Sequence, residues 1–371
     1  MIREVAQGTL PAVERGRIIA SLLTGAWRNE PGSAPVTVEE LQLVVPTLVR
    51  SGTAALAWRR IRGGALASTG PGAEIQTARR IQAAQAAIRQ AQLDQVLSLE
   101  VVRAVDPILL KGWAHGQLYP EPAVRHYTDF DLLVRPDARS ALSEAVYSVI
   151  SIDPERGAPF DIQTTLKDLP ERTWIQLLAH SRLVRVSSAQ VRVLGPEDTL
   201  RLSCIHMLRH LGFHPLWLCD ISVLVENLPA DFDWDYCLAG ERRRTEWMLA
   251  VLRLANQVLD TRLDRCPERR LPQTVPPWLV RAMLRWWGTE RTYVYPWPLP
   301  NPAVSVAKDD PRRILQVFSD RWPDPLEAVG RFAWPINRFS GLTAQLLDFT
   351  GRAVIWAPRQ LGFFPRKSTS D

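Results

Sequence analysis

The sequence predicts an α+β fold that is mainly helical, with a small mixed sheet near the middle of the chain. Apolar residues recur at helical spacing over about the first hundred residues and again from about residue 200 onward. Between these regions, short apolar runs of strand length alternate with helical ones. A chain of 371 residues is long enough for two or three packed units. We therefore expect an N-terminal helical region (1–104), an α+β core (105–200) and a C-terminal helical domain (201–371).

The N-terminal region has helical spacing over residues 10–23, 38–61 and about 73–104. Thr37, followed by acidic residues in the first turn, is a good start for the second of these helices. Several glycines and a proline between residues 63 and 72 predict a loop. The region has no ligand signature of its own, and we interpret it as a scaffold or cover.

The middle region predicts a small mixed sheet with helices on one face. Apolar runs of strand length and segments of helical period follow one another, and two late runs alternate like a hairpin. The expected elements, in chain order, are strand 107–110, helix 113–119, strand 129–134, helix 138–149, strand 160–166, helix 173–180 and the hairpin strands 183–186 and 191–194.

The C-terminal region returns to helical spacing after residue 198, and this spacing continues to about Leu259. Prolines and aromatic residues between 293 and 302 predict a loop or extended connection. Further helices are expected over residues 277–287, 311–318 and 341–360.

The chemistry is concentrated in a strand that carries two carboxylates. Asp129 and Asp131 are one residue apart on an apolar strand, so their side chains project to the same face. Two ionised carboxylates side by side on a buried strand are costly unless a cation or a proton compensates them. A third carboxylate, Asp161, also lies between apolar residues on a later strand. This order predicts metal-assisted phosphoryl or nucleotidyl transfer. The alternative is that Asp129 caps a turn and Asp131 pairs with Arg125 or Arg135.

The chain resembles a known family in two segments, which together cover roughly residues 105 to 230. Leu110-Lys111-Gly112, Tyr119, Arg125 and the run from Thr128 to Val134 resemble the "LKG … Y … R … DIDLLV" pattern of the bacterial uncharacterised nucleotidyltransferase family, within the polymerase β-like superfamily. Residues 202–213 and 218–221 resemble the helical "LxHL … H … LxDI" segment of that family. No match is evident for residues 1–100 or 270–371.

The resemblance implies roles for several residues of the first segment and for Asp161. Asp129 and Asp131 would ligate two Mg²⁺ ions, and Asp161 would complete the catalytic metal site and receive a proton from the acceptor. Gly112 would let backbone N–H groups approach the phosphates, and Lys111 would place a charge on the triphosphate. The alternative for Lys111 is a solvated strand end.

Arg125 has two open interpretations. It is placed to clamp a phosphate or to orient the metal ligands. The alternative is a plain ion pair with Asp129.

The helical segment carries further candidates. The resemblance implies that His206, Arg209 and His210 face the active-site cleft and contact a phosphate or the base; the alternative is a structural, interfacial role for the histidines. The two histidines have a spacing that can bind zinc, but the sequence shows neither a further ligand nor the usual intervening glutamate. We expect Asp220 to bind His210 or Arg209 and fix this geometry.

Composition limits the partners. The net charge of +6 comes almost wholly from arginine, which suits phosphate-bearing ligands, although a solvated, ion-paired surface is the alternative. Two basic clusters lack interleaved aromatic residues, so nucleic acid is possible as a partner but less favoured. These clusters are Arg242–Arg244 and Arg265, Arg269 and Arg270.

The compartment is predicted from cysteine usage and from the early residues. Four scattered cysteines without a CxxC pair indicate a reduced, cytosolic protein. Residues 1–25 show no signal peptide, and no apolar run reaches the length of about 20 residues that spans a bilayer. We therefore expect a cytoplasmic location and no membrane partner.

The leading hypothesis is a Mg²⁺-dependent transferase that moves a nucleoside monophosphate from an NTP, such as ATP, to a hydroxyl or phosphate of a small molecule or peptide. The family implies a place in natural-product or polysaccharide biosynthesis. One alternative is a toxin-like enzyme that modifies tRNA. The other is a protein of the same fold that binds nucleotide or peptide without turnover.

Overall fold

The fold is mainly helical with one small mixed sheet, which confirms the predicted class. This computed structural model describes residues 10–150, 159–289, 322–331 and 334–360. The predicted helix over 311–318 and the predicted connection over 293–302 lie outside these residues.

The chain divides into two compact units. The first contains Met1–Thr274 together with Met283–Glu290, and the second contains Val275–Ala282 together with Arg291–Asp371. The sheet and all the candidate site residues belong to the first unit.

The N-terminal helices confirm the three predicted helical segments and divide two of them. The predicted helix over 38–61 breaks at Gly52, which has a φ of +68° that favours glycine. Thr37 forms the expected cap, since its side chain accepts from Glu40 N (3.2 Å) and Glu40 Oε2 accepts from Thr37 N (2.9 Å). The helices are α1 (Ala12–Leu23), α2 (Val38–Arg50), α3 (Ala54–Ile61), α4 (Gly70–Leu97) and α5 (Glu100–Val105).

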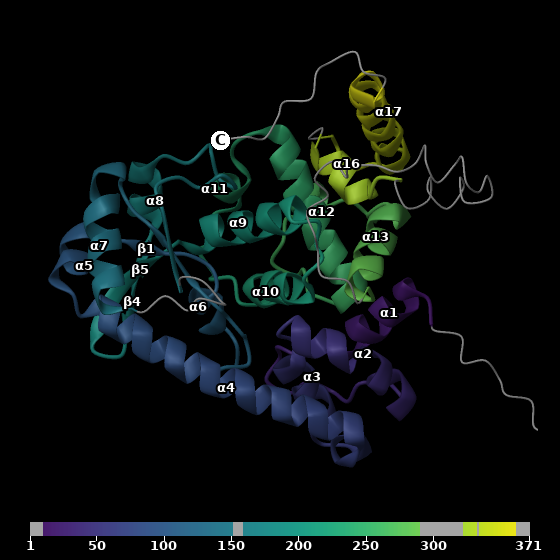
Figure 1. Cartoon of the computed structure of the whole chain (residues 1–371), viewed down its shortest axis with the longest axis horizontal. Coiled ribbons are helices and arrows are strands. Elements are labelled where there is room, and N and C mark those ends of the chain that lie inside the picture. The colour runs from purple at the N-terminus through teal and green to yellow at the C-terminus, as the bar shows by residue number, and fades with distance from the viewer. Residues whose placement is uncertain (1–9, 151–158, 290–321, 332–333, 361–371) are drawn as a thin grey trace, which may run out of the picture. The chain divides into compact units, whose positions relative to one another are not determined.

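Helix α4 joins the N-terminal helices to the sheet. It begins earlier than predicted, because the hydroxyl of Thr69 caps it by accepting from Gly72 N. Along its length it packs first against α2 and α3 and then against α5, α7 and strand β5, as Figure 1 shows for the long helix beneath the other elements. The N-terminal region is therefore packed directly on the α+β core.

The sheet has five strands in the order β3-β2-β1-β5-β4. Strands β2 and β3 are parallel, as are β1 and β5, whereas β1–β2 and β4–β5 are antiparallel. This confirms the predicted mixed sheet and its hairpin. The strands are β1 (Ile108–Leu109), β2 (Phe130–Leu133), β3 (Phe160–Gln163), β4 (Arg182–Val186) and β5 (Ala189–Val193). The short helices between them are α6 (Trp113–Gly116), α7 (Arg139–Val149) and α8 (Trp174–His180).

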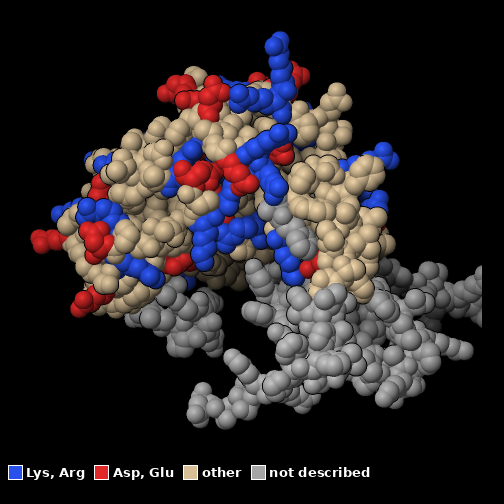
Figure 2. Space-filling view, turned by 90° about the horizontal axis from the view of Figure 1, so that it is seen from above, with Lys and Arg blue, Asp and Glu red and all other residues tan. Residues whose placement is uncertain are grey.

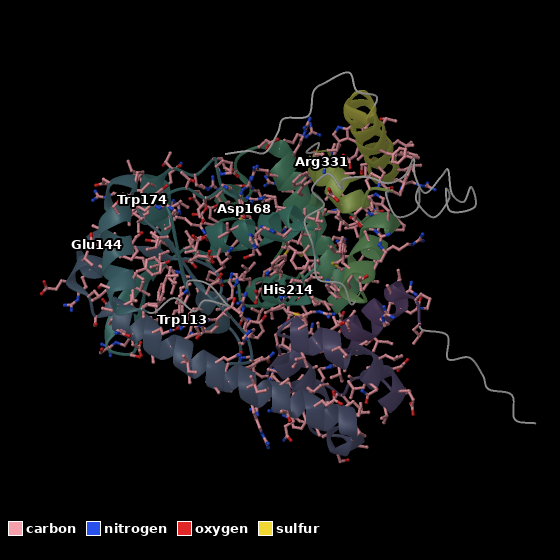
Figure 3. The ribbon with its side chains drawn as sticks, in the orientation of Figure 1. Trp113, Glu144, Asp168, Trp174, His214 and Arg331 are labelled. Atoms are coloured by element: carbon pink, nitrogen blue, oxygen red, sulfur yellow. The ribbon has the colours of Figure 1, made fainter. Side chains whose placement is uncertain are left out.

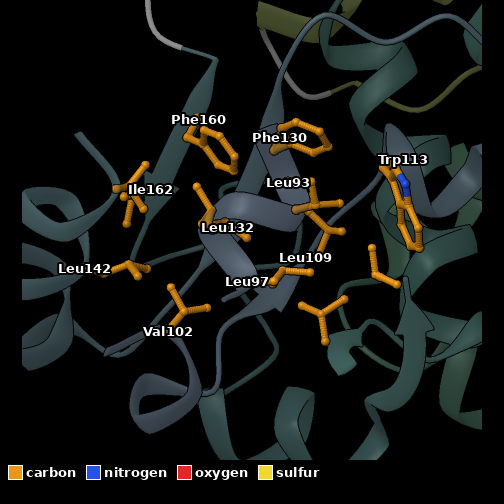
Figure 4. Close-up of a cluster of buried hydrophobic side chains, with 14 of the residues drawn as sticks. Leu93, Leu97, Val102, Leu109, Trp113, Phe130, Leu132, Leu142, Phe160 and Ile162 are labelled. Carbon is orange, nitrogen blue, oxygen red and sulfur yellow. The ribbon is translucent and has the colours of Figure 1, made fainter. Parts of the chain in front are cut away.

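One face of the sheet carries the main hydrophobic core. Phe130 and Leu132 of β2 lie beside Phe160 and Ile162 of β3, and the two phenylalanine rings stack at 4.9 Å (Figure 4). Helices α4, α5 and α7 cover this face. Since side chains alternate along a strand, the aspartates of β2 and β3 project to the opposite face.

The opposite face is also partly covered, which the sequence did not predict. Leu133 of β2 packs in a second cluster with Leu177 of α8 and Leu202 of α9. The expectation of helices on one face only is therefore wrong. This arrangement places α9 on the side of the sheet that carries the aspartates.

The C-terminal helical stretch ends near Leu259 as predicted, but left-handed residues divide it. Leu211 (φ +60°) and Gly212 (φ +58°) reverse the chain after α9, and Gly212 N donates to Met207 O at 2.8 Å. The helices are α9 (Pro196–Arg209), α10 (Pro215–Glu226), α11 (Trp234–Leu238), α12 (Arg242–Leu259) and α13 (Pro277–Trp287).

The second unit contains α16 (Pro325–Arg331) and α17 (Ser340–Gln360). These two helices pack around a small cluster that includes Ala328 and Ala344, with Trp278 against it. Helix α17 confirms the predicted helix over 341–360. None of the helices in the described ranges is both long and apolar enough to cross a bilayer.

Candidate active site

The sheet register brings two of the predicted carboxylates together. Asp131 on β2 is the direct partner of Asp161 on the parallel neighbour β3. Adjacent strands are about 4.8 Å apart, and paired residues of parallel strands project to the same face. Asp129 lies just before β2, two residues from Asp131, and so belongs to the same face.

Asp131 is the buried member of this group, and its two oxygens have different partners. Gln163 Nε2 donates to Asp131 Oδ1 at 2.9 Å and to Asp161 Oδ2 at 2.6 Å, so both carboxylates lie within reach of one nitrogen atom. Lys111 Nζ lies 3.5 Å from Asp131 Oδ2. Asp131 is 8% exposed, whereas Asp129 and Asp161 are exposed. Its alternative pairing with Arg125 or Arg135 is therefore wrong.

The negative charge of Asp131 is only partly balanced by the cation beside it. Burial raises its pKa, Lys111 opposes this rise, and the charges of Asp129 and Asp161 add to it. Like charges gathered at a partly dry site are a feature that favours a bound cation.

The donor chemistry of this group suits Mg²⁺, which prefers carboxylate oxygens. Among the residues that the structure describes, however, no three Asp, Glu, His or Cys side chains are arranged to hold a metal ion as they stand. Lys111 and Gln163 occupy the oxygens of Asp131. Asp129 and Asp161 are both exposed, so each has room to rotate toward a shared ion.

Gly112 has a backbone that the site requires. Its φ of +53° and ψ of −102° favour glycine, and it precedes the short helix α6. A Cβ built on Gly112 would lie 3.6 Å from the carbonyl oxygen of Asp129. The turn after β1 is therefore adjacent to the first carboxylate, and it places Lys111 next to Asp131.

Arg125 belongs to a buried ion-pair network, and its side-chain hydrogen bonds to carboxylates go to Asp220 and not to the aspartates of the sheet. Its NH2 and Nε lie 2.7 and 3.2 Å from Asp220, and its NH1 donates to the carbonyl of His126 at 2.9 Å. Tyr119 Oη also donates to Asp220, at 2.9 Å, and His115 Nδ1 lies 3.4 Å away. The predicted ion pair of Arg125 with Asp129 is wrong, because the carboxylate that binds Arg125 comes from α10.

Asp220 is correspondingly a structural anchor. Burial disfavours its charged form, but Arg125 and His115 outweigh burial and hold the pKa of Asp220 well below its usual range. The expectation that Asp220 binds His210 or Arg209 is wrong, since its partners come from α6 and from the segment between α6 and β2.

A second polar cluster lies against α9 and is centred on Asp168, a loop residue. His206 Nδ1 lies 3.0 Å from Asp168 Oδ2, and Arg209 donates to Asp168 Oδ1. Arg244 NH1 donates to the carbonyl of Asp168 at 3.0 Å. Burial opposes ionisation of Asp168, but His206, Arg209 and Lys111 together lower its pKa. Because Lys111 acts on this cluster as well as on Asp131, the two clusters lie close enough to interact.

The histidines of α9 are neutral at physiological pH. Burial lowers the pKa of His206, and burial with the neighbouring His206 and Arg209 lowers the pKa of His210 to about 4. A neutral imidazole adds no charge for a phosphate. Around Asp168, the positive charge is carried by Arg209, Arg244 and the nearby Lys111.

A family model described as "uncharacterised nucleotidyltransferase" matches residues 38–260, more than half of the chain. The chain belongs to this family. The match extends from α2 to α12 and contains the three carboxylates, Lys111, Gly112 and the α9 cluster. No curated protein and no solved structure matches.

The family region begins earlier in the chain than the sequence resemblance indicated. Residues 38–100 belong to the family region, although their sequence showed no resemblance that we identified. Helices α2, α3 and α4 are thus part of the family region that carries the site, in keeping with the packing of α4 on the sheet.

Several arginines of the two basic clusters are paired with acidic side chains. Arg242 lies 2.8 Å from Glu246, and Arg244 lies 3.4 Å from Glu241. Figure 2 shows Lys and Arg interspersed with Asp and Glu on the face that it presents. These contacts favour the interpretation of the clusters as solvated, ion-paired helix faces.

Two residues of the site, Gln163 and Asp168, have contacts that were not predicted from the sequence. Gln163 lies two residues after Asp161, and strand alternation would have placed it on the same face. Asp168, labelled in Figure 3 beside α9, is in a loop, and no pattern links it to a helix that begins at Pro196. Only the folded chain brings it to His206.

Proposed function

We propose that this chain is a Mg²⁺-dependent nucleotidyltransferase that moves a nucleoside monophosphate from an NTP to a hydroxyl or phosphate of a small-molecule or peptide acceptor. The family supports nucleotidyl transfer in general. The observation that carries the finer proposal is the pairing of Asp131 with Asp161 on adjacent parallel strands, with Asp129 on the same face.

In this proposal the chain's own residues bind the triphosphate and handle the proton. Lys111 leaves Asp131 to contact the phosphates, since the pair is long, at 3.5 Å, and the Lys111 side chain is 27% exposed. The acceptor oxygen forms a bond to the α-phosphorus, the bond to the bridging oxygen breaks, and pyrophosphate leaves. Asp161, which is exposed, takes the proton of an acceptor hydroxyl.

Asp129, Asp131 and Asp161 are the residues that would hold Mg²⁺. When bound there, the ion neutralises the phosphate oxygens and lowers the pKa of the attacking hydroxyl. The raised pKa of Asp131 supports this assignment, because burial, and to a smaller extent the charges of Asp129 and Asp161, disfavour the ionised form that a bound cation would stabilise. Gln163 would then keep Asp131 and Asp161 aligned.

We also infer a cytoplasmic location and a place in natural-product or polysaccharide biosynthesis. The four cysteines are all free and buried, which suits a reducing compartment with abundant NTP.

The test is transfer from each α-labelled NTP with Mg²⁺ and a panel of acceptors, with pyrophosphate release measured in parallel. Asp129→Asn, Asp131→Asn and Asp161→Asn should each reduce the rate by a factor of about 100 or more, as expected when a group that stabilises transition-state charge is lost. Asp137→Asn is the matched control, since Asp137 is an exposed aspartate that pairs only loosely with Arg135, at 3.4 Å.

Two outcomes would contradict the proposal. Unchanged transfer in folded Asp129→Asn and Asp131→Asn would remove the metal assignment. Tight NTP and Mg²⁺ binding by calorimetry, without pyrophosphate release over long incubation, would favour the binding protein without turnover.

A further inference from the structure

Five ring side chains gather where α9 turns into α10. We call this group the aromatic wall; it consists of His206, His210, Phe213, His214 and Trp217. The other four rings surround Trp217, with centroid distances of 5.0 Å to His206, 5.6 Å to His210, 5.0 Å to Phe213 and 5.3 Å to His214. Most of these contacts are edge-to-face, a favoured arrangement for aromatic pairs.

The wall is partly open to solvent, whereas its surroundings are buried. All five rings are partly exposed, although most residues of α9 and α10 are buried. The left-handed pair Leu211 and Gly212 turns the chain so that the rings of α9 meet those of α10. Rings that served only to fill the core between these helices would be covered as their neighbours are.

The wall lies on the same side of the sheet as the carboxylates. Leu133, on the Asp131 face of β2, packs in one cluster with Leu202 of α9. His206 follows Leu202 by one turn of the same helix, a rise of about 6 Å. His214 is labelled at the start of α10 in Figure 3.

Lys111 connects the two groups electrostatically. Its ammonium lies 3.5 Å from Asp131 and also lowers the pKa of His206 and of His210. A nucleoside triphosphate has a charged end and a flat aromatic end. Lys111 suits the charged end, and the rings of the wall suit the flat end.

We propose that the aromatic wall is the subsite on which the base of the nucleotide stacks, with Trp217 and His210 as its principal residues. This inference rests on the proposed function and names a part of the site that binds base and not phosphate. The rings are neutral at physiological pH, since His210 and His214 both have a pKa of about 4, chiefly because of burial. Stacking on such faces tolerates any base, so the subsite discriminates weakly between NTPs.

The experiment compares two ligands on the full chain, ATP and inorganic tripolyphosphate, each with Mg²⁺, by calorimetry. Tripolyphosphate has the charged end without the base. Trp217→Ala and His210→Ala should each raise the Kd for ATP by about tenfold, the usual effect of removing one stacking ring, and leave the Kd for tripolyphosphate unchanged. Trp217→Phe, which keeps a ring, should restore most of the preference for ATP.

A control variant tests whether the effect belongs to this cluster. Trp234→Ala removes another partly exposed ring, which packs on Phe232 at 4.7 Å on α11, and should change neither Kd. If Trp217→Ala does not fold, His210→Ala decides alone, because His210 is at the helix end and its loss leaves the contacts of Trp217 with Phe213 and His214 in place.

The outcomes separate this inference from the proposed function. If ATP binds no more tightly than tripolyphosphate, or if the variants weaken both ligands equally, the base subsite is overturned while transfer chemistry stands. If ATP is preferred and the preference is lost in Trp217→Ala, the subsite is supported even in a protein that transfers nothing.

Discussion

Asp131 and Asp220 are both buried aspartates of the family segments, yet their surroundings differ in kind. Asp220 is 1% exposed and receives donors from Arg125 and Tyr119, with His115 close by. Asp131 is 8% exposed, has one distant cation, and faces two further carboxylates. The pKa of the first is lowered and that of the second is raised. A satisfied carboxylate anchors the fold, and an under-compensated one marks the place where a ligand is expected.

The largest effect on stability should follow from breaking the anchor. Asp220→Ala leaves the guanidinium of Arg125 buried without its partner, and the loss of one member of a buried pair costs about 3–5 kcal/mol. Urea denaturation measures this as a lower unfolding free energy. A loss under about 1 kcal/mol would mean that Arg125 finds another partner and that the anchor is not structural.

Asp131→Asn should show the opposite behaviour. Because the folded pKa of Asp131 is raised, its charged form opposes folding once the pH exceeds the ordinary value of 3.8. At pH 7 the variant should therefore be as stable as the unmodified protein or more stable, by up to about 1 kcal/mol, while transfer is lost. Denaturation and activity on the same preparation provide the measurement. A marked loss of stability would show that Asp131 is a second anchor.

The wall histidines predict a pH dependence of stability. His210 and His214 have folded pKa values of about 4, below the ordinary 6.5, so the unfolded chain binds more protons between these values. The unfolding free energy should fall as the pH drops from about 6.5 to about 4, by roughly 2 kcal/mol per histidine at most, since both rings are partly solvated. His210→Gln should reduce the slope of this fall, and an unchanged slope would contradict the assignment.

Gly112→Ala should give a modest loss of stability together with a clear loss of activity. Gly112→Ala places a side chain in a left-handed backbone without a close contact, which costs about 1–2 kcal/mol. Gly116→Ala is the control: it lies in α6 with helical geometry, its Cβ would have no contact under 3.9 Å, and alanine should be tolerated or favourable there. Equal effects of the two substitutions would mean that the turn at Gly112 has no special role.

The positions of helices and strands along the chain were predicted better than which of them lie side by side in the fold. Alternation located β2 and β3 and the face of their aspartates, because that information is local to each strand. The pairing of Asp131 with Asp161 depends on strand order, and an apolar pattern does not specify order. The same holds for Asp220, whose partners come from a loop about a hundred residues earlier.

The residues gathered around α9 show the same limit of prediction from sequence. The helix was predictable from periodicity, but Asp168 and Trp217 join His206 only through the fold. A positive φ is needed at Gly52, where the predicted helix over 38–61 breaks, and at the turn of Gly112. A glycine permits a positive φ, but its presence in the sequence does not show that the backbone adopts one.

A crystal structure of the chain with a non-hydrolysable NTP and Mn²⁺ is the most direct test of a metal site between Asp131 and Asp161. If these aspartates bind metal, manganese should give anomalous density between Asp131 and Asp161, and Lys111 should have moved from Asp131 onto the phosphates. Manganese bound elsewhere, with Lys111 and Gln163 still holding Asp131 while the nucleotide is bound, would contradict it.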